Sequence, residues 1–136
     1  MSNIDFTQVV SAGDKAEAHR QTLLADLASL RWAAETGGVT LQNGFFARTD
    51  RETRAALREA VSTLHDGLMQ DPIQWKTPAG WVDLTLDELE PITAAVAAHV
   101  QRCFAAELAV EAQIEGLLDL SSFDIQAAFE AAMVSA

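Results

Sequence analysis

The chain has 136 residues, of which 49% are hydrophobic, and its formal net charge is −11. This length suits one domain with its own core, and the hydrophobic content excludes an intrinsically disordered chain. Residues 83–136 hold ten acidic side chains against Arg102 alone. That acidity is typical of a solvated flank, and it argues against nucleic acid or an anionic membrane as a partner.

Targeting and redox signals are absent from the sequence itself. No apolar run approaches the roughly 20 residues of a membrane span, and the first residues lack the basic and apolar segments of a secretory signal. The single cysteine, Cys103, excludes an internal disulfide. We therefore expect a soluble protein made in a reducing cytoplasm.

The first elements along the chain are an N-terminal arm over residues 1–13 and a long helix over residues 15–36. The arm is expected either to fray or to become ordered only against a neighbouring molecule. Asp14 is expected to cap the helix, whose leucines recur at helical spacing on one face. Gly37 and Gly38 are expected to end it, because glycine tolerates the left-handed conformation that closes a helix.

A β-hairpin is predicted next, around Asn43-Gly44, which lies between two short β-prone runs. A two-residue turn of this kind needs positive φ at both positions, which Asn-Gly favours. It pairs Gln42 with Phe45 and so places Phe45 on the polar face. The opposite, apolar face then consists of Val39, Leu41 and Phe46.

A helix start follows this hairpin. Thr49 and Glu52 are three residues apart and predict a capping box, in which each side chain binds a backbone N–H of the first turn. The second helix is expected to run to about Gln70, because Asp71-Pro72 stops it.

The second hairpin follows the plan of the first at an offset of 36 residues, with a wider turn over residues 77–80. Trp81 falls on its outer face, in the position equivalent to Phe45. Thr85 and Glu88 then predict a second capping box and a long helix without an obvious stop before residue 116. Alternation predicts an inner face made of Ile73, Trp75, Val82 and Leu84.

The long helix would extend about 45 Å, more than a domain of this size needs. Its far end is therefore expected to project or to pack on another chain. A seam near heptad spacing is compatible with a homo-oligomer, although core packing explains its first half equally well. The seam residues are Leu89, Ile92, Val96, Cys103, Val110 and Leu117.

A last short helix is expected after Ser121 or Ser122, either of which could cap it. Ile125, Phe129 and Met133 recur every four residues and form an apolar stripe suited to a groove in a partner.

The elements predict a helix-rich α+β fold of the order α-ββα-ββα, with a C-terminal helical extension. Three segments are expected: the N-terminal arm over 1–13, the α+β domain over 14–107 and the extension over 108–136. Phe45 and Trp81, with Trp32 nearby, are candidate aromatic anchors of a protein interface. The alternative is that the first helix covers this hairpin face and buries them.

Catalytic motifs are not recognisable in the chain. It has no glycine-rich phosphate loop, no nucleophile elbow and no zinc-protease motif. His99 and Cys103 are four residues apart and could form half a zinc site, but no second ligand pair completes it. A core histidine above a buried cysteine explains them better, so we expect no enzyme activity, no cofactor and no metal.

Several segments carry a family resemblance. The most specific are Trp75-Lys76-Thr77-x-x-Gly80 and Ala98-His99-Val100-Gln101-x-Cys103-Phe104-Ala-x-Glu107, and the others are Arg31-Trp-x-x-Glu35-Thr-x-Gly38-Val39, Gly44 and Thr49-Asp50-Arg51-Glu52. In these residues the chain from about Leu30 to Glu107 resembles a phage domain catalogued as domain of unknown function 4376. Residues 108–136 and the arm fall outside this resemblance and are expected to be specific to this protein's own partners.

Members of that family occur in tailed bacteriophages and prophages, often in tail or tail-fibre genes. The resemblance implies a structural or adaptor protein of the virion tail, made in the host cytoplasm, whose partners are other tail or fibre proteins. It is also compatible with a tail-fibre assembly chaperone that is absent from the mature virion. A small host-takeover binder is a third interpretation. The family has no established active site to carry over.

Overall fold

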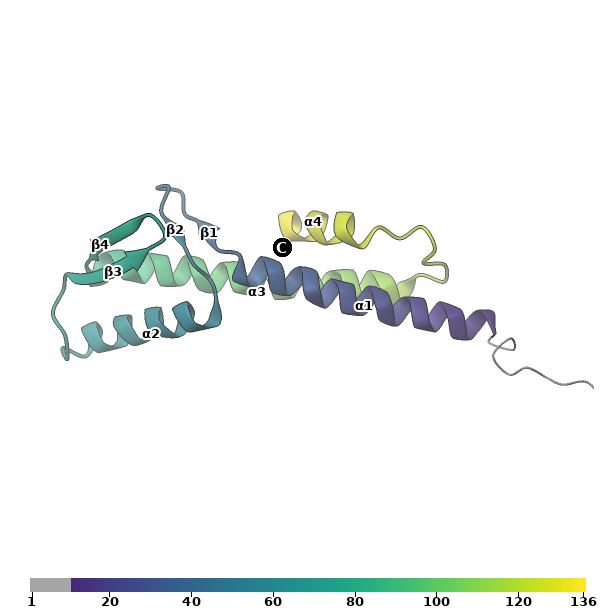
Figure 1. The fold of residues 1–136 in the computed structure, drawn as a ribbon, viewed down its shortest axis with the longest axis horizontal. Helices are drawn as coiled ribbons and strands as arrows, with labels where there is room; N and C mark the ends of the chain where they lie inside the picture. Colours follow the sequence, from purple (N-terminus) through teal and green to yellow (C-terminus); the bar gives the residue numbers. More distant parts are fainter. Residues whose placement is uncertain (1–10) are drawn as a thin grey trace, which may run out of the picture. The chain divides into compact units, whose positions relative to one another are not determined.

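The computed structural model describes residues 11–136, and most of the predicted arm lies outside the described residues (Figure 1). Helices and two antiparallel hairpins alternate as predicted, so the fold is α+β and helix-rich. Among the described residues, no helix has the length and apolar character of a membrane span. The elements are α1 (Ala12–Thr36), β1 (Val39–Thr40), β2 (Phe46–Ala47), α2 (Arg51–His65), β3 (Ile73–Thr77), β4 (Gly80–Leu84), α3 (Leu86–Gly116) and α4 (Ile125–Ser135).

The chain divides into two compact units. The middle unit, Trp32–Phe104, contains both hairpins, α2, the end of α1 and the first part of α3. The terminal unit combines the described residues up to Arg31 with Ala105–Ala136. This division differs from the predicted boundary at residue 107, because the residues beyond it form a unit with α1 instead of an appended extension.

The middle unit has one hydrophobic core, to which both hairpins, α2 and the first part of α3 contribute. Figure 1 shows α2 running alongside that part of α3, with the hairpins next to them. The core residues of each helix recur at three- and four-residue spacing, which places them on one face. The buried members are Ala47, Leu57, Ala60, Leu64, Leu84, Leu89, Ile92 and Val96.

The second hairpin leaves only Pro78 and Ala79 between the paired residues Thr77 and Gly80, so the expectation of a wider turn was wrong. Ile73 pairs with Leu84, Trp75 with Val82 and Thr77 with Gly80. Burial alternates along both strands, because successive side chains of a strand point to opposite faces. The predicted inner face is therefore confirmed.

The first hairpin differs from its prediction by one residue in register. Val39 pairs with Ala47, whereas the predicted two-residue turn would pair it with Arg48. Gly44 has φ +86°, whereas Asn43 is not among the residues with positive φ, so the turn is a three-residue loop ending in a left-handed glycine. A slip of one residue moves side chains to the other face, and accordingly Ala47 is buried and Phe46 is exposed.

The helix starts agree with prediction in one case only. The predicted capping box of α3 is confirmed: Thr85 N–H donates to Glu88 Oε1 at 3.1 Å and Glu88 N–H donates to Thr85 Oγ1 at 3.3 Å. At α1 the prediction was wrong, because Ser11 and not Asp14 is the cap. Asp14 N–H donates to Ser11 Oγ at 3.1 Å, so α1 begins at Ala12, earlier than expected.

The cap of α2 is Asp50, not the predicted Thr49. Asp50 Oδ2 accepts the Thr53 backbone N–H at 3.0 Å, which satisfies a donor of the first turn. Thr49 is instead fully buried, and its Oγ1 accepts the Gly38 N–H at 2.8 Å across the first hairpin. Thr and Asp are both common N-caps, so the local sequence Thr49-Asp50 allowed either assignment.

The end of α2 and the start of α4 were also placed wrongly. α2 ends at His65, before the predicted Gln70, and Gly67 with φ +75° follows the cap residue Asp66. At α4, Asp124 accepts the Ala127 N–H at 3.1 Å, in place of the predicted serine caps.

The terminal unit is held together by polar contacts between α1 and the far half of α3. Arg31 Nε lies 3.1 Å from Glu107 Oε1, and both side chains are largely buried. Arg20 donates to the Ile114 carbonyl and, at 3.3 Å, to the Leu117 carbonyl near the end of α3. A guanidinium at these carbonyls complements the negative end of the helix dipole.

Several apolar side chains in the far half of α3 are buried within the chain. Val110, Ile114 and the Leu27 side chain of α1 are fully buried, and Leu23 of α1 is 5% exposed. The expectation that this end of the helix projects from the chain was therefore wrong. Leu117, at the end of the predicted coiled-coil seam, stays 41% exposed.

Candidate functional site

Trp81 is the most exposed aromatic side chain of the described residues. It lies on the outer face of the second hairpin with 69% of its surface exposed. Its cross-strand partner Lys76 places Nζ 5.7 Å from the centroid of the indole ring. The ammonium group is attracted by the negative face of the ring, which orients the indole without burying it.

Phe45 does not lie on the polar face where the two-residue turn would place it. The observed register makes it partly buried, and it packs against the hydrophobic core of the middle unit. It also lines a cavity of about 250 Å³ together with Trp75, Leu57 and Ile92. The predicted equivalence of Phe45 and Trp81 as surface anchors was therefore wrong.

Phe46 takes the surface position instead, with 42% of its surface exposed. Its ring lies against Gly38, where an added Cβ would be 2.2 Å from the Phe46 Cζ atom. Sequence reasoning missed this residue because Asn-Gly also suits the last two positions of a three-residue loop.

Trp32, the third predicted anchor of the hairpin region, is 47% exposed in the last turns of α1. The Arg51 guanidinium carbon lies 4.8 Å from the centroid of the Trp32 ring, which is a cation–π distance. Trp81 stays exposed, so the alternative that the first helix covers it does not hold.

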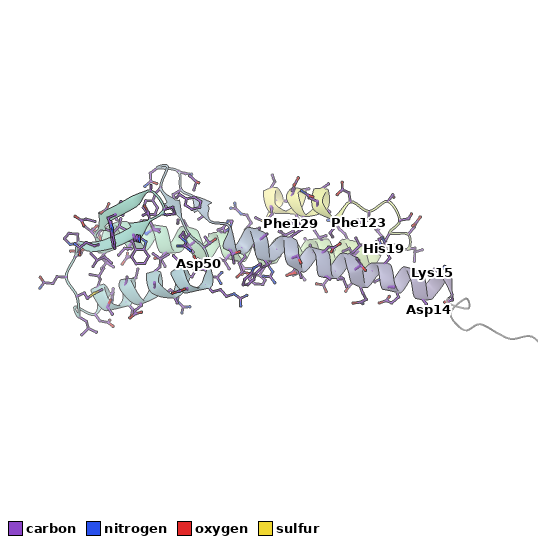
Figure 2. All side chains as sticks on the ribbon, viewed as in Figure 1. Asp14, Lys15, His19, Asp50, Phe123 and Phe129 are labelled. Atoms are coloured by element: carbon purple, nitrogen blue, oxygen red, sulfur yellow. The ribbon has the colours of Figure 1, made fainter. Side chains whose placement is uncertain are left out.

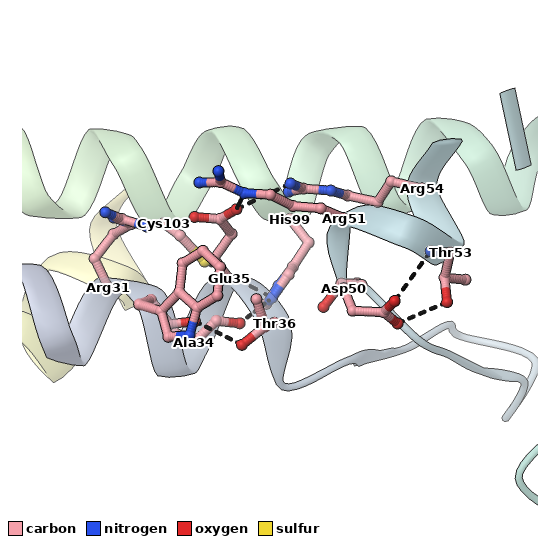
Figure 3. Close-up of polar contacts among 12 residues, drawn as sticks. Arg31, Ala34, Glu35, Thr36, Asp50, Arg51, Thr53, Arg54, His99 and Cys103 are labelled. Atoms are coloured by element: carbon pink, nitrogen blue, oxygen red, sulfur yellow. Dashed lines mark hydrogen bonds and ion pairs between the residues drawn. The ribbon is translucent and has the colours of Figure 1, made fainter. Parts of the chain in front are cut away.

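Glu35, beside Trp32 in α1, is the one fully buried acidic side chain of residues 11–136 (Figure 3). Its Oε2 lies 2.9 Å from Arg54 Nη2 and 3.3 Å from Arg51 Nε, both on α2. A buried carboxylate requires such charged partners, since desolvation otherwise disfavours its ionised form. The cluster thus joins the last turn of α1 to the first turns of α2.

Asp50 forms a second polar contact at the start of α2 (Figure 3). The Thr53 hydroxyl donates to its Oδ1 at 2.6 Å, and this hydrogen bond is the main cause that lowers the pKa of the Asp50 carboxyl. Arg48, with Nε 3.4 Å from Oδ1, lowers the pKa further.

Near the C-terminus, hydrogen bonds from Ser121 lower the pKa of the Asp119 carboxyl.

His99 and Cys103 are packed together within the chain. His99 Nε2 lies 2.8 Å from the Ala34 carbonyl and 3.7 Å from Cys103 Sγ, and Cys103 is fully buried. A carbonyl only accepts, so Nε2 carries the hydrogen. In the described part of the chain, no three His, Cys, Asp or Glu side chains are grouped as metal ligands require.

The α4 stripe is directed into its own unit. Phe129 is 5% exposed, and Ile125 and Met133 are partly buried. Figure 2 labels Phe129 on α4 and His19 on α1. His19 Nε2 lies 3.2 Å from the carbonyl of Leu120, which precedes α4. Phe129 is therefore not available as a surface anchor, contrary to the prediction.

Comparison with known proteins identifies one family. Residues 18–132 match the model described as Domain of unknown function (DUF4376). The match extends well beyond the segment 30–107 that carried the resemblance, so most of the C-terminal extension is part of the family domain and not specific to this chain. Comparisons with curated proteins and with solved structures found no match. The chain belongs to the DUF4376 family.

Proposed function

We propose that this protein is a structural adaptor of a bacteriophage tail or tail fibre, located in the virion and acting through protein–protein contacts. Its partners are other tail or fibre proteins. The family resemblance of the sequence, which implies a tail component, motivates the phage setting. The exposure of Trp81 supports the mode of action.

The exposed indole of Trp81 carries the argument for a protein contact. An aromatic side chain buries 150–250 Å² when it is covered, so covering the exposed 69% of Trp81 would contribute roughly 3 kcal/mol at about 25 cal/mol per Å². Tryptophan is enriched among the residues that dominate binding energy at interfaces. The Lys76 ammonium group lies over the ring, 5.7 Å from its centroid.

Mass spectrometry of purified virions tests the structural role. We expect the protein in intact particles, at a constant ratio to the other tail proteins. Trp81→Ser should remove it from particles while the isolated protein stays folded, because the exposed ring contributes little to the core. Virions that lack the wild-type protein would refute the structural role.

The second candidate is a tail-fibre assembly chaperone, favoured by the same exposed aromatic side chains, since a chaperone also needs a surface that binds and releases. It would copurify with fibre protein from infected cells and be absent from mature particles.

A further inference from the structure

We propose that the groove between β1 and α3 binds an extended segment of a partner protein that carries a carboxylate side chain. We call it the β1 groove; it measures about 500 Å³ and is lined by Val39–Asn43, Ala95, Ala98, His99 and Arg102. The proposal rests on the proposed function, in which the protein acts through protein contacts, and it specifies the chemistry of one partner. All of these residues belong to the middle unit.

The groove has room for a short peptide segment. Its volume lies within the 300–1,000 Å³ typical of ligand sites. Ala95 and Ala98 line it on α3, and the small side chain of alanine lets a bound backbone approach closely. Val39 and Leu41 add apolar surface on the hairpin side. The groove therefore favours small or β-branched apolar side chains.

The free edge of β1 supplies the backbone contacts for such a segment. Leu41 N–H donates to the Phe45 carbonyl at 2.8 Å, so Leu41 is hydrogen-bonded toward the opposite arm of the hairpin. Hydrogen-bonded and non-bonded positions alternate in an antiparallel pair, so the N–H and C=O of Thr40 point away from β2. Within residues 11–136, β1 pairs only with β2. An unpaired edge of this kind accepts an added strand.

Arg102 selects the charge of the segment. It is the one basic residue after position 82, it is exposed at the groove, and it has no ion pair among the described residues. A guanidinium binds a carboxylate through two parallel hydrogen bonds, which fixes orientation as well as charge. His99 cannot compete for the ligand through Nε2, because that atom donates to Ala34.

The test is an NMR titration of the ¹⁵N-labelled full chain with the peptide acetyl-Val-Thr-Val-Glu-Val-amide. We expect shifts at Thr40, Leu41 and Ala98 on addition of about 1 mM peptide. A matched peptide with Gln in place of Glu should bind about fivefold more weakly, the size expected for an exposed ion pair. Arg102→Gln should remove this difference, whereas Arg58→Gln on the exposed face of α2 should leave it unchanged.

Backbone N-methylation separates strand addition from simple charge attraction. Methylating the amide that faces Thr40 should abolish binding, and methylating the next amide along the peptide should not, because alternate amides face opposite edges. Shifts outside the groove, or equal affinity for the Glu and Gln peptides, would overturn the proposal. That result would leave the adaptor function intact, because presence in virions is measured independently.

Discussion

Removing the buried carboxylate of Glu35 should destabilise the middle unit more than removing its exposed partner Arg51. Glu35→Ala leaves the Arg54 guanidinium, which is 20% exposed, without the carboxylate that neutralises it. Arg54 Nη1 is already buried with no hydrogen-bond partner among the described residues. The variant therefore isolates a largely buried cation at the junction of α1 and α2.

The magnitude follows from the burial of each partner. Breaking a buried ion pair from one side costs 3–5 kcal/mol, and partial access of water to Arg54 places Glu35→Ala at about 3 kcal/mol. Arg51 is 61% exposed, so Arg51→Ala removes a contact that water largely replaces, and we expect about 0.5 kcal/mol. Glu35→Gln keeps the shape and one acceptor oxygen and should fall between these values, at about 2 kcal/mol.

Urea unfolding monitored by tryptophan fluorescence measures these differences in stability for the middle unit. The three tryptophans, at positions 32, 75 and 81, all lie in the middle unit. Glu59→Ala on the exposed face of α2 is the matched control, expected within about 0.5 kcal/mol of wild type. The slope with urea should stay constant, so that the midpoint alone reports stability.

Equal losses for Glu35→Ala and Arg51→Ala would refute this reasoning. So would a stabilised Glu35→Ala variant, since it would mean that the desolvation cost of the cluster exceeds its attraction. A double-mutant cycle of Glu35 with Arg54 then measures their coupling directly, and we expect at least about 1 kcal/mol.

Three further predictions concern other parts of the middle unit. Trp81→Ser should change the free energy of unfolding by less than about 0.5 kcal/mol, whereas Trp75→Ser, on the core face of the same hairpin, should cost about 3 kcal/mol in a urea titration. The pKa of Asp50 is lowered, so its carboxylate stabilises the folded chain above the unfolded pKa of 3.8, and this stabilisation is lost as pH falls through the folded pKa. Asp50→Asn should therefore flatten the pH dependence of the free energy of unfolding below about pH 4. An unchanged profile would contradict this. Gly38→Ala should lower the stability measured by thermal unfolding by at least about 2 kcal/mol more than Gly44→Ala. Both glycines have positive φ, but only at Gly38 would the new methyl group meet a neighbouring ring. Equal losses would contradict this.

Local patterns predicted the parts of the fold that depend on neighbours in sequence. Strand alternation placed Trp75 inside and Trp81 outside, and the Thr85–Glu88 spacing predicted the start of α3. Both patterns follow from the fixed periods of strands and helices, which a short segment contains in full. The candidate surface residue Trp81 was found for the same reason.

Where two local solutions used the same residue types, the sequence did not distinguish them. Asn43-Gly44 fits a two-residue and a three-residue turn, and the choice between them decides whether Phe45 or Phe46 reaches the surface. Thr49-Asp50 offered two caps in the same way. In the observed fold, Thr49 accepts a hydrogen bond from Gly38, 11 residues away, while Asp50 caps α2.

Local periodicity predicted the class of fold, the number of hairpins and the inner face of the second one, because each depends on spacing within a few residues. Two features became visible in the folded chain alone: Glu35 is buried between arginines 16 and 19 residues further along the chain, and the far end of α3 forms a unit with α1. These features depend on contacts between distant segments. The free energy of such contacts comes from shared burial and charge pairing, which local spacing does not encode.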